Sequence, residues 1–243
     1  MTRTIVFAPD EKFCKYFGVA LQSLIDNSES SATYEIIIFD ADISNINKNR
    51  IIQMLPPNFS LRFFNITEYL KQNFGHIIFK TTASWSLSTY YRLFLPIILQ
   101  GYERVLYCDS DIIFNQPVDE LFEMKFENNQ IMAVLDTISP ILFSNRKLEK
   151  HFINVLKLKN PEKYFNSGIL MFNIPAINIE EYTRLLTDIL QNINLHYLDQ
   201  DALNIIFAGK TKYLSCRWNY QWGTQFQKLD YETIISGVYK KDF

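Results

Sequence analysis

The stretch "RVLYCDSDIIF", residues 104–114, places Asp109 and Asp111 directly after an apolar run. The run before Asp109 predicts a buried strand, and the "IIF" after Asp111 predicts that the chain returns at once to the core. Two carboxylates in such a place repel each other and are poorly solvated unless a cation neutralises them. The stretch is therefore either a metal site or a polar turn after a strand.

Short apolar runs alternate with segments of helical period on both sides of this stretch, which is typical of an α/β fold. The strands that we expect cover residues 4–8, 34–39, 61–66, 104–109, 130–136 and 166–174. The helices that we expect cover residues 13–24, 44–55, 88–99, 180–190 and 200–207.

Local signals refine three of these helices. In the first, the apolar positions from Phe13 and Tyr16 to Leu24 should face the sheet because they recur at helical spacing. Ser44 should cap the second helix, since its hydroxyl can accept a bond from a free backbone N–H. Pro96 should kink or interrupt the third helix.

The composition predicts a packed globular protein: 243 residues with 48% hydrophobic and 15% aromatic side chains. A net charge of −2 offers no basic field, so we expect no nucleic-acid partner. Cys14, Cys108 and Cys216 have no metal-binding spacing and should be buried free thiols. The chain begins without a secretory apolar segment and has no run of about 18 apolar residues, so we expect a cytoplasmic protein.

The seven glycines of the chain form neither G-x-G-x-x-G nor G-x-x-x-x-G-K-[ST]. Neither a glycine-rich dinucleotide turn nor a Walker A phosphate loop is therefore indicated. If the chain binds a nucleotide, side chains and a metal ion must hold its phosphates.

The pattern D-x-D occurs three times, at Asp40/Asp42, Asp109/Asp111 and Asp199/Asp201. The first pair lies just ahead of the expected cap at Ser44, so turn and capping chemistry explains it without a ligand. The second pair follows a strand, where ligands of open α/β sheets collect. Hard divalent cations such as Mg²⁺ or Mn²⁺ accept such carboxylates together with substrate phosphates. Asp109/Asp111 is therefore the best metal candidate of the three.

Six segments occur in a particular order along the chain. They are "TIVFAPDEKF" at 4–13, "STYYRLFLP" at 88–96, "RVLYCDSDII" at 104–113, "YFNSGILMFNI" at 164–174, "DQDALN" at 199–204 and "RWNY" at 217–220. This series resembles glycosyltransferase family 8, the retaining nucleotide-sugar transferases that include glycogenin and bacterial lipopolysaccharide galactosyl- and glucosyltransferases. The resemblance runs from residue 4 to about residue 220. It implies the GT-A fold, a single α/β nucleotide-sugar-binding domain with a mixed, mainly parallel central sheet.

The resemblance also implies roles for individual residues. The implied donor-binding residues are Ala8 and Asp10 at the uracil and ribose, Thr89 and Arg92 at the sugar or diphosphate, and Ser110, Asn166 and Ser167 nearby. Asp109 and Asp111 match the metal-binding pair, with Mn²⁺ usual and Mg²⁺ the alternative. The implied catalytic residues are Asp199 and Gln200 near the anomeric carbon and Asp136 at the donor hexose.

These roles are chemically sensible for transfer from a UDP-sugar. Breaking the bond between sugar and diphosphate builds negative charge, which a divalent cation and Arg92 would stabilise. A double displacement needs a carboxylate nucleophile, for which Asp199 is better suited than the amide of Gln200. A front-face route, in which the leaving phosphate takes the acceptor proton, needs neither. The resemblance implies retention, and both routes stay open.

Several of these residues also have a local structural explanation. Asp10 could cap the helix that begins near Phe13, and Arg92 could lie on a solvated helix face. Asn166 could be a turn residue. Asp201 could be a carboxylate favoured by the dipole at a helix start rather than a sugar contact.

The chain departs from the family pattern in three places. Lys12 replaces the asparagine often found at its position. The late segment "H-x-x-G-x-x-K-P-W", which supplies a third metal ligand and a lysine for the diphosphate, is absent from the sequence. None of His76, His151 and His196 matches that ligand, and Lys240 and Lys241 read as a solvated terminus. The basic, aromatic membrane-docking tail is absent as well, so we expect a catalytic domain over residues 1–243 without these parts.

The leading hypothesis is a metal-dependent retaining hexosyltransferase that moves galactose or glucose from a UDP-sugar to a glycan acceptor, an oligosaccharide or lipooligosaccharide of a bacterial surface. It would act in the cytoplasm or peripherally at the inner face of the cell membrane. An aspartate-dependent phosphohydrolase is disfavoured because Ile113 stands where D-x-D-x-T requires threonine. The alternative is a non-catalytic or truncated nucleotide-sugar-binding domain.

Overall fold

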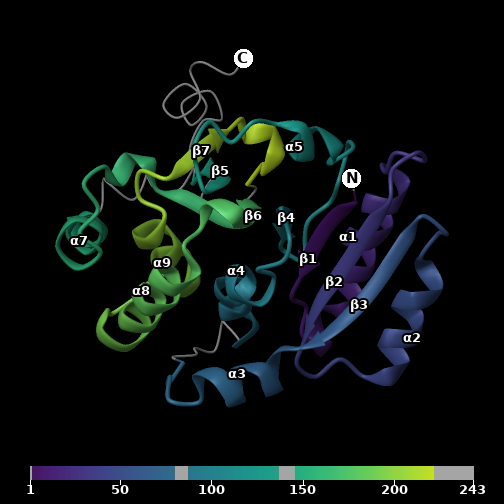
Figure 1. The fold of residues 1–243 in the computed structure, drawn as a ribbon, viewed down its shortest axis with the longest axis horizontal. Helices are drawn as coiled ribbons and strands as arrows, with labels where there is room; N and C mark the ends of the chain where they lie inside the picture. The colour runs from purple at the N-terminus through teal and green to yellow at the C-terminus, as the bar shows by residue number, and fades with distance from the viewer. Residues whose placement is uncertain (1, 80–86, 137–145, 222–243) are drawn as a thin grey trace.

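The computed structural model describes residues 2–79, 87–136 and 146–221, and within them seven strands form one sheet (Figure 1). Their order is β3-β2-β1-β4-β6-β5-β7. The strands are β1 (Arg3–Phe7), β2 (Tyr34–Asp40), β3 (Phe59–Asn65), β4 (Arg104–Cys108), β5 (Ile131–Leu135), β6 (Phe165–Asn173) and β7 (Thr211–Leu214). The first four run parallel, β6 is antiparallel to β4 and β5, and β7 is parallel to β5. The sheet is mixed and mainly parallel, as predicted.

Helices cover both faces of the sheet, which is why its strands read as near-continuous apolar runs. One face packs against α1 (Cys14–Asp26), α2 (Asn45–Met54) and α5 (Asp119–Glu123). The other packs against α3 (Ile66–Phe74), the 3₁₀ helix Leu87–Phe94, α4 (Leu95–Ile98), α8 (Ile179–Asn192) and α9 (Leu198–Ile206). Along β1, Ile5 and Phe7 belong to the first layer and Val6 to the second, as the side-chain period of two requires.

A smaller apolar cluster lies beside this core. Its buried members are Phe152, Leu156 and Tyr164. Phe152 lies in the π-helical turn His151–Val155, which follows α7 (Arg146–Lys150), and Leu156 comes directly after this turn. Tyr164 directly precedes β6. The remaining short helical turns are Glu11–Phe13, Pro161–Lys163, Ile174–Ala176 and Cys216–Trp218.

The order of the strands creates a switch point between β1 and β4. The chain moves outward from β1 through β2 to β3 and then returns with β4 on the other side of β1. At such a point the connections that leave the two central strands diverge, and a crevice forms beyond their carboxyl ends. The segment 109–111 follows β4 at this edge.

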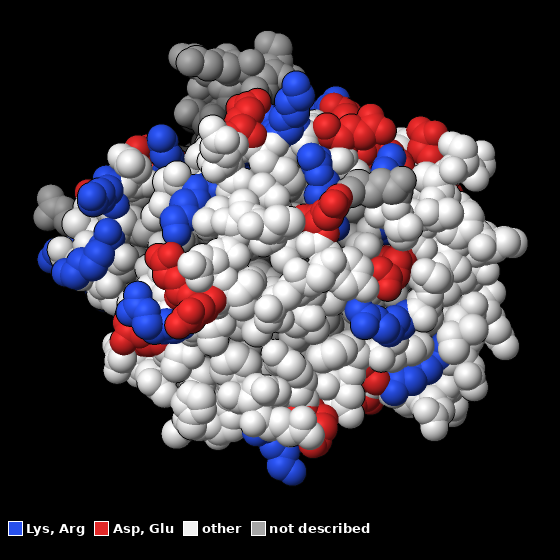
Figure 2. All heavy atoms as spheres, in the orientation of Figure 1, with Lys and Arg blue, Asp and Glu red and all other residues white. Residues whose placement is uncertain are grey.

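One face of the molecule carries charges of both signs (Figure 2), and the three thiols are buried. Figure 2 shows acidic and basic side chains interspersed over one face, in keeping with a net charge of −2. Cys14, Cys108 and Cys216 are buried thiols outside any disulfide bond, as predicted. Among the described residues, no helix has the length and apolarity needed to cross a bilayer.

The first helix differs from the prediction at its start. Phe17, Ala20, Leu21 and Leu24 face the core as expected, but Phe13 is 42% exposed and Tyr16 is 47% exposed. The α-helix begins only at Cys14, which takes the inward position of the first turn. The prediction that Phe13 and Tyr16 face the sheet is therefore wrong.

The segment 88–99 is not one α-helix. It consists of the 3₁₀ helix Leu87–Phe94 and the short α4, and Pro96 stands in the first turn of α4, so the predicted interruption is confirmed. The run after Asp111 is not a buried strand either. Ile113 is 65% exposed, and Phe114 alone of the "IIF" run is buried.

Some elements had no sequence prediction. β7 is a four-residue strand with only two buried positions, which is too short for a periodic signal. α3 was not predicted, although its start carries a capping signal. The Asn65 side chain accepts a hydrogen bond of 3.0 Å from the backbone N–H of Glu68. An asparagine followed three residues later by a glutamate is a helix-start pattern.

Candidate active site

A cleft of about 630 Å³ opens at the carboxyl ends of β1 and β4. All the predicted site residues except Asp136 line it. Ala8 and Asp10 follow β1, Thr89 and Arg92 come from the 3₁₀ helix, and Asp109, Ser110 and Asp111 follow β4. Asn166 and Ser167 begin β6, which runs antiparallel, and Asp199 and Gln200 come from the first turn of α9. The sheet thus brings to one edge residues that are far apart in sequence.

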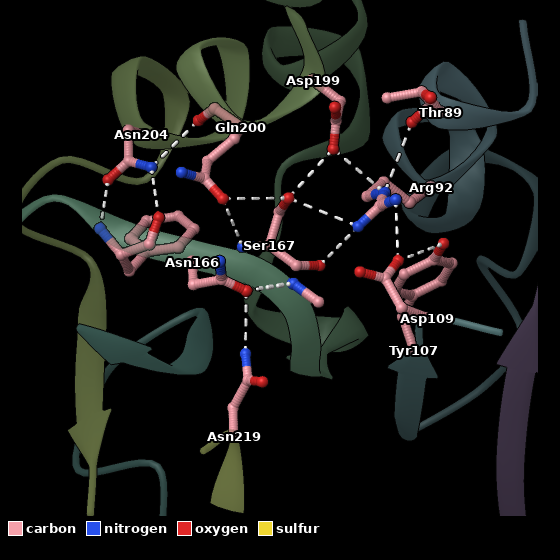
Figure 3. Close-up of polar contacts among 12 residues, drawn as sticks. Thr89, Arg92, Tyr107, Asp109, Asn166, Ser167, Asp199, Gln200, Asn204 and Asn219 are labelled. Atoms are coloured by element: carbon pink, nitrogen blue, oxygen red, sulfur yellow. Dashed lines mark hydrogen bonds and ion pairs between the residues drawn. The ribbon is translucent and has the colours of Figure 1, made fainter. Parts of the chain in front are cut away.

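Arg92 lies at the centre of the polar contacts in the cleft (Figure 3). Its Nη2 pairs with Asp109 Oδ1 at 2.8 Å and its Nε with Asp199 Oδ2 at 3.0 Å. Its Nη1 donates to the carbonyl of Ser167 at 2.7 Å. The guanidinium also lies 4.6 Å from the ring centroid of Tyr107. Burial alone would lower the pKa of Arg92, but the charges of Asp109 and Asp199 outweigh it and raise the pKa, so Arg92 is a fixed cation here.

Asp199 is a buried carboxylate that shares Arg92 with Asp109. It is 4% exposed, and Ser167 Oγ donates to its Oδ2 at 3.0 Å. Burial raises the pKa of Asp199 to about 6, against the opposing effect of Arg92 and with a further rise from the charge of Asp109. The carboxyl group is thus held in place by a cation and a hydroxyl at the wall of the cleft.

Asp109 and Asp111 form the acidic end of the cleft. Asp109 Oδ1 accepts a hydrogen bond of 3.3 Å from the hydroxyl of Tyr107. The backbone N–H of Asp109 donates to the carbonyl of Gly168 at 2.8 Å. Asp111 stands at the exposed rim, where partial burial of its carboxyl and the charge of Asp109 raise its pKa. A Cβ built on Gly168 would meet Asp109 Oδ2 at 2.8 Å. Glycine at this position therefore keeps space open beside that oxygen.

A network of amides forms the end of the cleft next to α9. Gln200 Oε1 accepts the backbone N–H of Ser167 at 3.0 Å, and its Nε2 donates to Asp136 Oδ2 at 2.8 Å. Asn166 Oδ1 accepts the backbone N–H of Gly168 at 2.8 Å (Figure 3). Asp136 is 5% exposed, lies behind Gln200, and does not line the cleft. The amides of Gln200 and Asn166 are thus held in place by backbone and side-chain partners.

Other aspartates of the chain have structural roles. Asp40 accepts the backbone N–H of Ile43 at 2.9 Å, so the local turn explanation is confirmed for Asp40. Asp42 instead accepts the backbone N–H of Glu11 at 3.0 Å, a structural bond to a distant segment rather than a local turn. Asp10 caps the turn at Phe13, with a bond of 2.9 Å, and also lines the cleft. Asp201 is fully buried and faces away from the cleft into protein donors.

Three aromatic side chains line the cleft without having been predicted to do so: Phe13, Tyr107 and Tyr197. Phe13 had been assigned to the core because its spacing fits a helix that starts one residue too early. Tyr197 lies two residues before Asp199, and its proximity to that residue was a usable signal. Asn219 of the "RWNY" segment had no assigned role, and its Nδ2 donates to Asn166 Oδ1 at 2.8 Å.

The chemistry of the donor set suits a divalent cation. Arg92 contributes one positive charge beside the carboxylates of Asp109, Asp111 and Asp199. These four side chains therefore have a net charge of −2 when all are ionised. Carboxylate oxygens are the ligands that Mg²⁺ and Mn²⁺ prefer. Within residues 2–79, 87–136 and 146–221 no cluster of three or more His, Cys, Asp or Glu side chains forms a complete site. Asp109 and Asp111 therefore fit as a partial set that phosphate oxygens and water would complete.

The sequence profile described as glycosyl transferase family 8 matches residues 4–237 of the chain. The chain belongs to this family. A Haemophilus influenzae protein that carries a provisional glycosyltransferase name is 30% identical over 223 residues, which cover 90% of the chain and 63% of that protein. The lipopolysaccharide 1,3-galactosyltransferase of Salmonella typhimurium is 24% identical over 243 residues, covering 96% of the chain and 67% of that enzyme. The family 8 chain thus spans about two thirds of the length of these relatives.

A solved structure supports the same assignment. The bifunctional glycosyltransferase WbbM, in its apo form, superposes with a TM-score of 0.82 at 27% identity, over 99% of the chain and 44% of WbbM. The predicted family and the predicted GT-A fold are therefore confirmed. This chain thus belongs to glycosyltransferase family 8 and is similar in sequence to lipopolysaccharide galactosyl- and glucosyltransferases.

Proposed function

We propose that this family 8 chain is the catalytic domain of a retaining hexosyltransferase that moves galactose or glucose from a UDP-sugar to a glycan acceptor. The proposed acceptor is a bacterial lipopolysaccharide or lipooligosaccharide, and the proposed cofactor is Mn²⁺ or Mg²⁺. The observation that carries the proposal is the cleft at the switch point, where a fixed arginine and three carboxylates surround a space of about 630 Å³. A nucleoside diphosphate needs cations close to its phosphates. Arg92 would supply one positive charge, and the three carboxylates would attract a divalent metal ion.

The two ends of the cleft suit the two ends of the donor. In this proposal the nucleoside lies against Ala8 and Asp10 at the end of β1. A divalent ion held by Asp109 and Asp111 would neutralise the charge that develops on the diphosphate as the sugar leaves. Ser110 lines the cleft between the two aspartates and is 8% exposed, and in this proposal it would lie beside the diphosphate.

The sugar end is built from polar groups that are already oriented. Thr89 and Arg92 reach it from the 3₁₀ helix, and Asn166, Ser167, Asp199 and Gln200 supply the hydrogen-bonding groups that would contact the hexose hydroxyls. Asp136 orients Gln200 through the 2.8 Å bond from Nε2. Because these groups are held by one another before any ligand arrives, they bind a sugar without losing much side-chain freedom.

Titration calorimetry with UDP tests the cation-bridged site. We expect wild-type protein to bind UDP with Mn²⁺, and we expect chelation or the Asp111→Asn substitution to weaken binding by about tenfold or more, which corresponds to about 1.4 kcal/mol. Asp42→Asn is the matched control, because Asp42 belongs to another D-x-D pair and accepts the N–H of Glu11 instead of lining the cleft. Equal UDP affinity with and without Mn²⁺ would contradict the proposed bridge.

Activity on a donor panel separates an enzyme from a binding domain. The protein is incubated with UDP-galactose, UDP-glucose or UDP-N-acetylglucosamine, with Mn²⁺ and lipooligosaccharide, and UDP release is measured. We expect turnover with one of the first two donors and an α-linked product by NMR, since retention preserves the donor's anomeric configuration. UDP binding without release or transfer from any of these donors would favour the non-catalytic alternative.

A further inference from the structure

A buried leucine in a left-handed backbone conformation stands at the sugar end of the cleft. Leu198 has a φ of 41° and is 4% exposed. Its neighbours on either side, Tyr197 and Asp199, both line the cleft. Branched, bulky side chains are unfavourable at such φ values, and such outliers persist only where the surrounding structure holds them. Something must therefore hold this turn.

The carboxylate of Asp201 holds it. Asp201 is 0% exposed, and its Oδ2 accepts the backbone N–H of His196 at 2.7 Å and that of Tyr197 at 3.0 Å. These two amides enter the turn, and the carbonyl of Tyr197 accepts the N–H of Gln200 at 2.9 Å as the chain leaves it. The backbone on both sides of Leu198 is thus fixed, and with it the direction of Asp199.

Two side chains from other segments hold Asp201 in turn. His151 Nε2 lies 2.9 Å from Oδ2, so the ring donates there when Nε2 carries the hydrogen. The hydroxyl of Tyr164 donates to Oδ1 at 2.6 Å. Tyr164 precedes β6, whereas His151 begins the π-helical turn that follows α7. Single π-turns inside helices are frequent at functional sites.

His151 is the member of this network that is best suited to substitution. Its side chain is 13% exposed, against 0% for Asp201, so it lies at the outer edge of the network. His196 is close by, with ring centroids 5.7 Å apart, but it is exposed and reaches Asp201 through its backbone N–H. In the part of the chain that the structure describes, neither His151 nor Asp201 lines the cleft.

We propose that His151 is a positioning residue for sugar transfer: through Asp201 it fixes the strained turn at Leu198 and so sets the direction of Asp199, Gln200 and Tyr197. This inference rests on the proposed function of the cleft. The nucleotide end is formed by residues that follow β1 and β4, and Arg92, which pairs with both Asp109 and Asp199, is its link to the network. Because this link is indirect, His151 should affect transfer more than UDP binding.

The test compares His151→Ala, His151→Gln and His196→Ala with wild type. Glutamine places an amide nitrogen near the position of Nε2 and should restore the bond to Asp201, while His196→Ala leaves the backbone donor intact. Amide hydrogen exchange is measured by NMR at Tyr197, whose N–H donates to Asp201. We expect faster exchange in His151→Ala, near wild-type exchange in His151→Gln, and no change in His196→Ala.

Kinetics supply the second measurement. With His151→Ala we expect kcat for transfer to fall roughly 10- to 100-fold, as small misplacements of reacting groups can cause, with UDP affinity within about twofold of wild type. We expect His151→Gln to recover most of kcat. Unchanged exchange at Tyr197 in His151→Ala, or parallel losses of UDP affinity and kcat, would overturn the positioning role. Absence of UDP binding in wild-type protein would instead refute the proposed function, while the exchange measurement would still decide the role of His151.

Discussion

Single contacts decide the geometry of the cleft, and Gly168 is the clearest case. Its backbone carbonyl receives the N–H of Asp109, and its missing side chain leaves room for two polar atoms. A Cβ there would lie 2.8 Å from Asp109 Oδ2 and 3.0 Å from Asn166 Oδ1. A Cβ contact of 2.8 Å is essentially never seen and one of 3.0 Å is rare, so the Asp109 side chain would have to move and Asn166 would have to shift slightly. The glycine therefore helps to set the positions of Asp109 and Asn166.

Replacing Gly168 by alanine should weaken Mn²⁺-dependent UDP binding by about tenfold or more, because Asp109 is pushed from its position. Overpacking of this kind also costs about 1–3 kcal/mol of folding free energy. Gly18→Ala is the control: it lies in α1 with nothing within 4 Å of the added Cβ, and alanine in a helix should stabilise by about 0.5–1 kcal/mol. Calorimetry and denaturant unfolding measure both effects. Wild-type UDP affinity in Gly168→Ala would show that Asp109 tolerates the shift.

Elements are joined at the site by buried side chains that bond to backbone. Asn204 of α9 is 4% exposed, and its Oδ1 accepts the N–H of Phe165 at 2.8 Å while its Nδ2 donates to the carbonyl of Phe165 at 2.9 Å (Figure 3). The same Nδ2 reaches the carbonyl of Gln200 at 2.9 Å. One amide thus sets the start of β6 against the first turn of α9, and with them Ser167 against Gln200.

The Asn204→Ala substitution should lower the free energy of unfolding by about 2–4 kcal/mol, because it leaves buried backbone groups without their partner. Asn192→Ala is a matched control. Asn192 is exposed near the end of α8 and donates to Asp188 at 2.7 Å, so its loss should cost about 0.5 kcal/mol or less. Urea unfolding followed by circular dichroism compares the two. Equal stabilities of the two variants would show that Asn204 does not clamp the elements.

The elements themselves were largely predictable, and the reason is periodicity. The strands around residues 34–39 and 166–174 and the helices at 44–55 and 180–190 appear close to where apolar spacing placed them. Boundaries failed where tertiary packing chose between candidates, as with Phe13 and Cys14 in the first turn of α1. β7 could not be predicted because its four residues carry no periodic pattern. It is a strand because it pairs with β5.

The gathering of the site was predictable only in part. Strand ends that share an edge explain why Ala8 and Asp109 meet, but contacts that cross the fold leave no local pattern. The 2.9 Å approach of His151 to Asp201 spans 50 residues, and the bond from Asn219 to Asn166 spans 53. Nor does any spacing reveal that Arg92 is shared between two carboxylates.

At the scale of the whole molecule, one sheet carries two apolar layers. The reactivity of the buried thiols can show how readily different parts of this structure open. Cys108 ends β4, between β1 and β6, and is 0% exposed. Cys14 begins α1 at the side of the cleft and is 7% exposed. Burial and then the charges of Glu11 and Asp42 raise the pKa of Cys14 to about 12, and burial raises the pKa of Cys108 well above its usual value.

Thiol labelling at pH 8 should therefore be slow throughout the native protein and slowest at Cys108. At four pH units below its pKa, Cys14 is a thiolate in only about one molecule in 10⁴, and the thiolate is the reactive form. Cys14 needs only a local opening of the first turn of α1, whereas Cys108 needs the central sheet to separate, so its labelling should follow global unfolding. The protein is treated with a disulfide-exchange reagent, and mass spectrometry gives the labelling rate of each cysteine. Denatured protein, in which all three cysteines are labelled, is the reference. Labelling of Cys108 as fast as that of Cys14 under native conditions would show that the sheet opens around the end of β4, where the cleft requires it to be rigid.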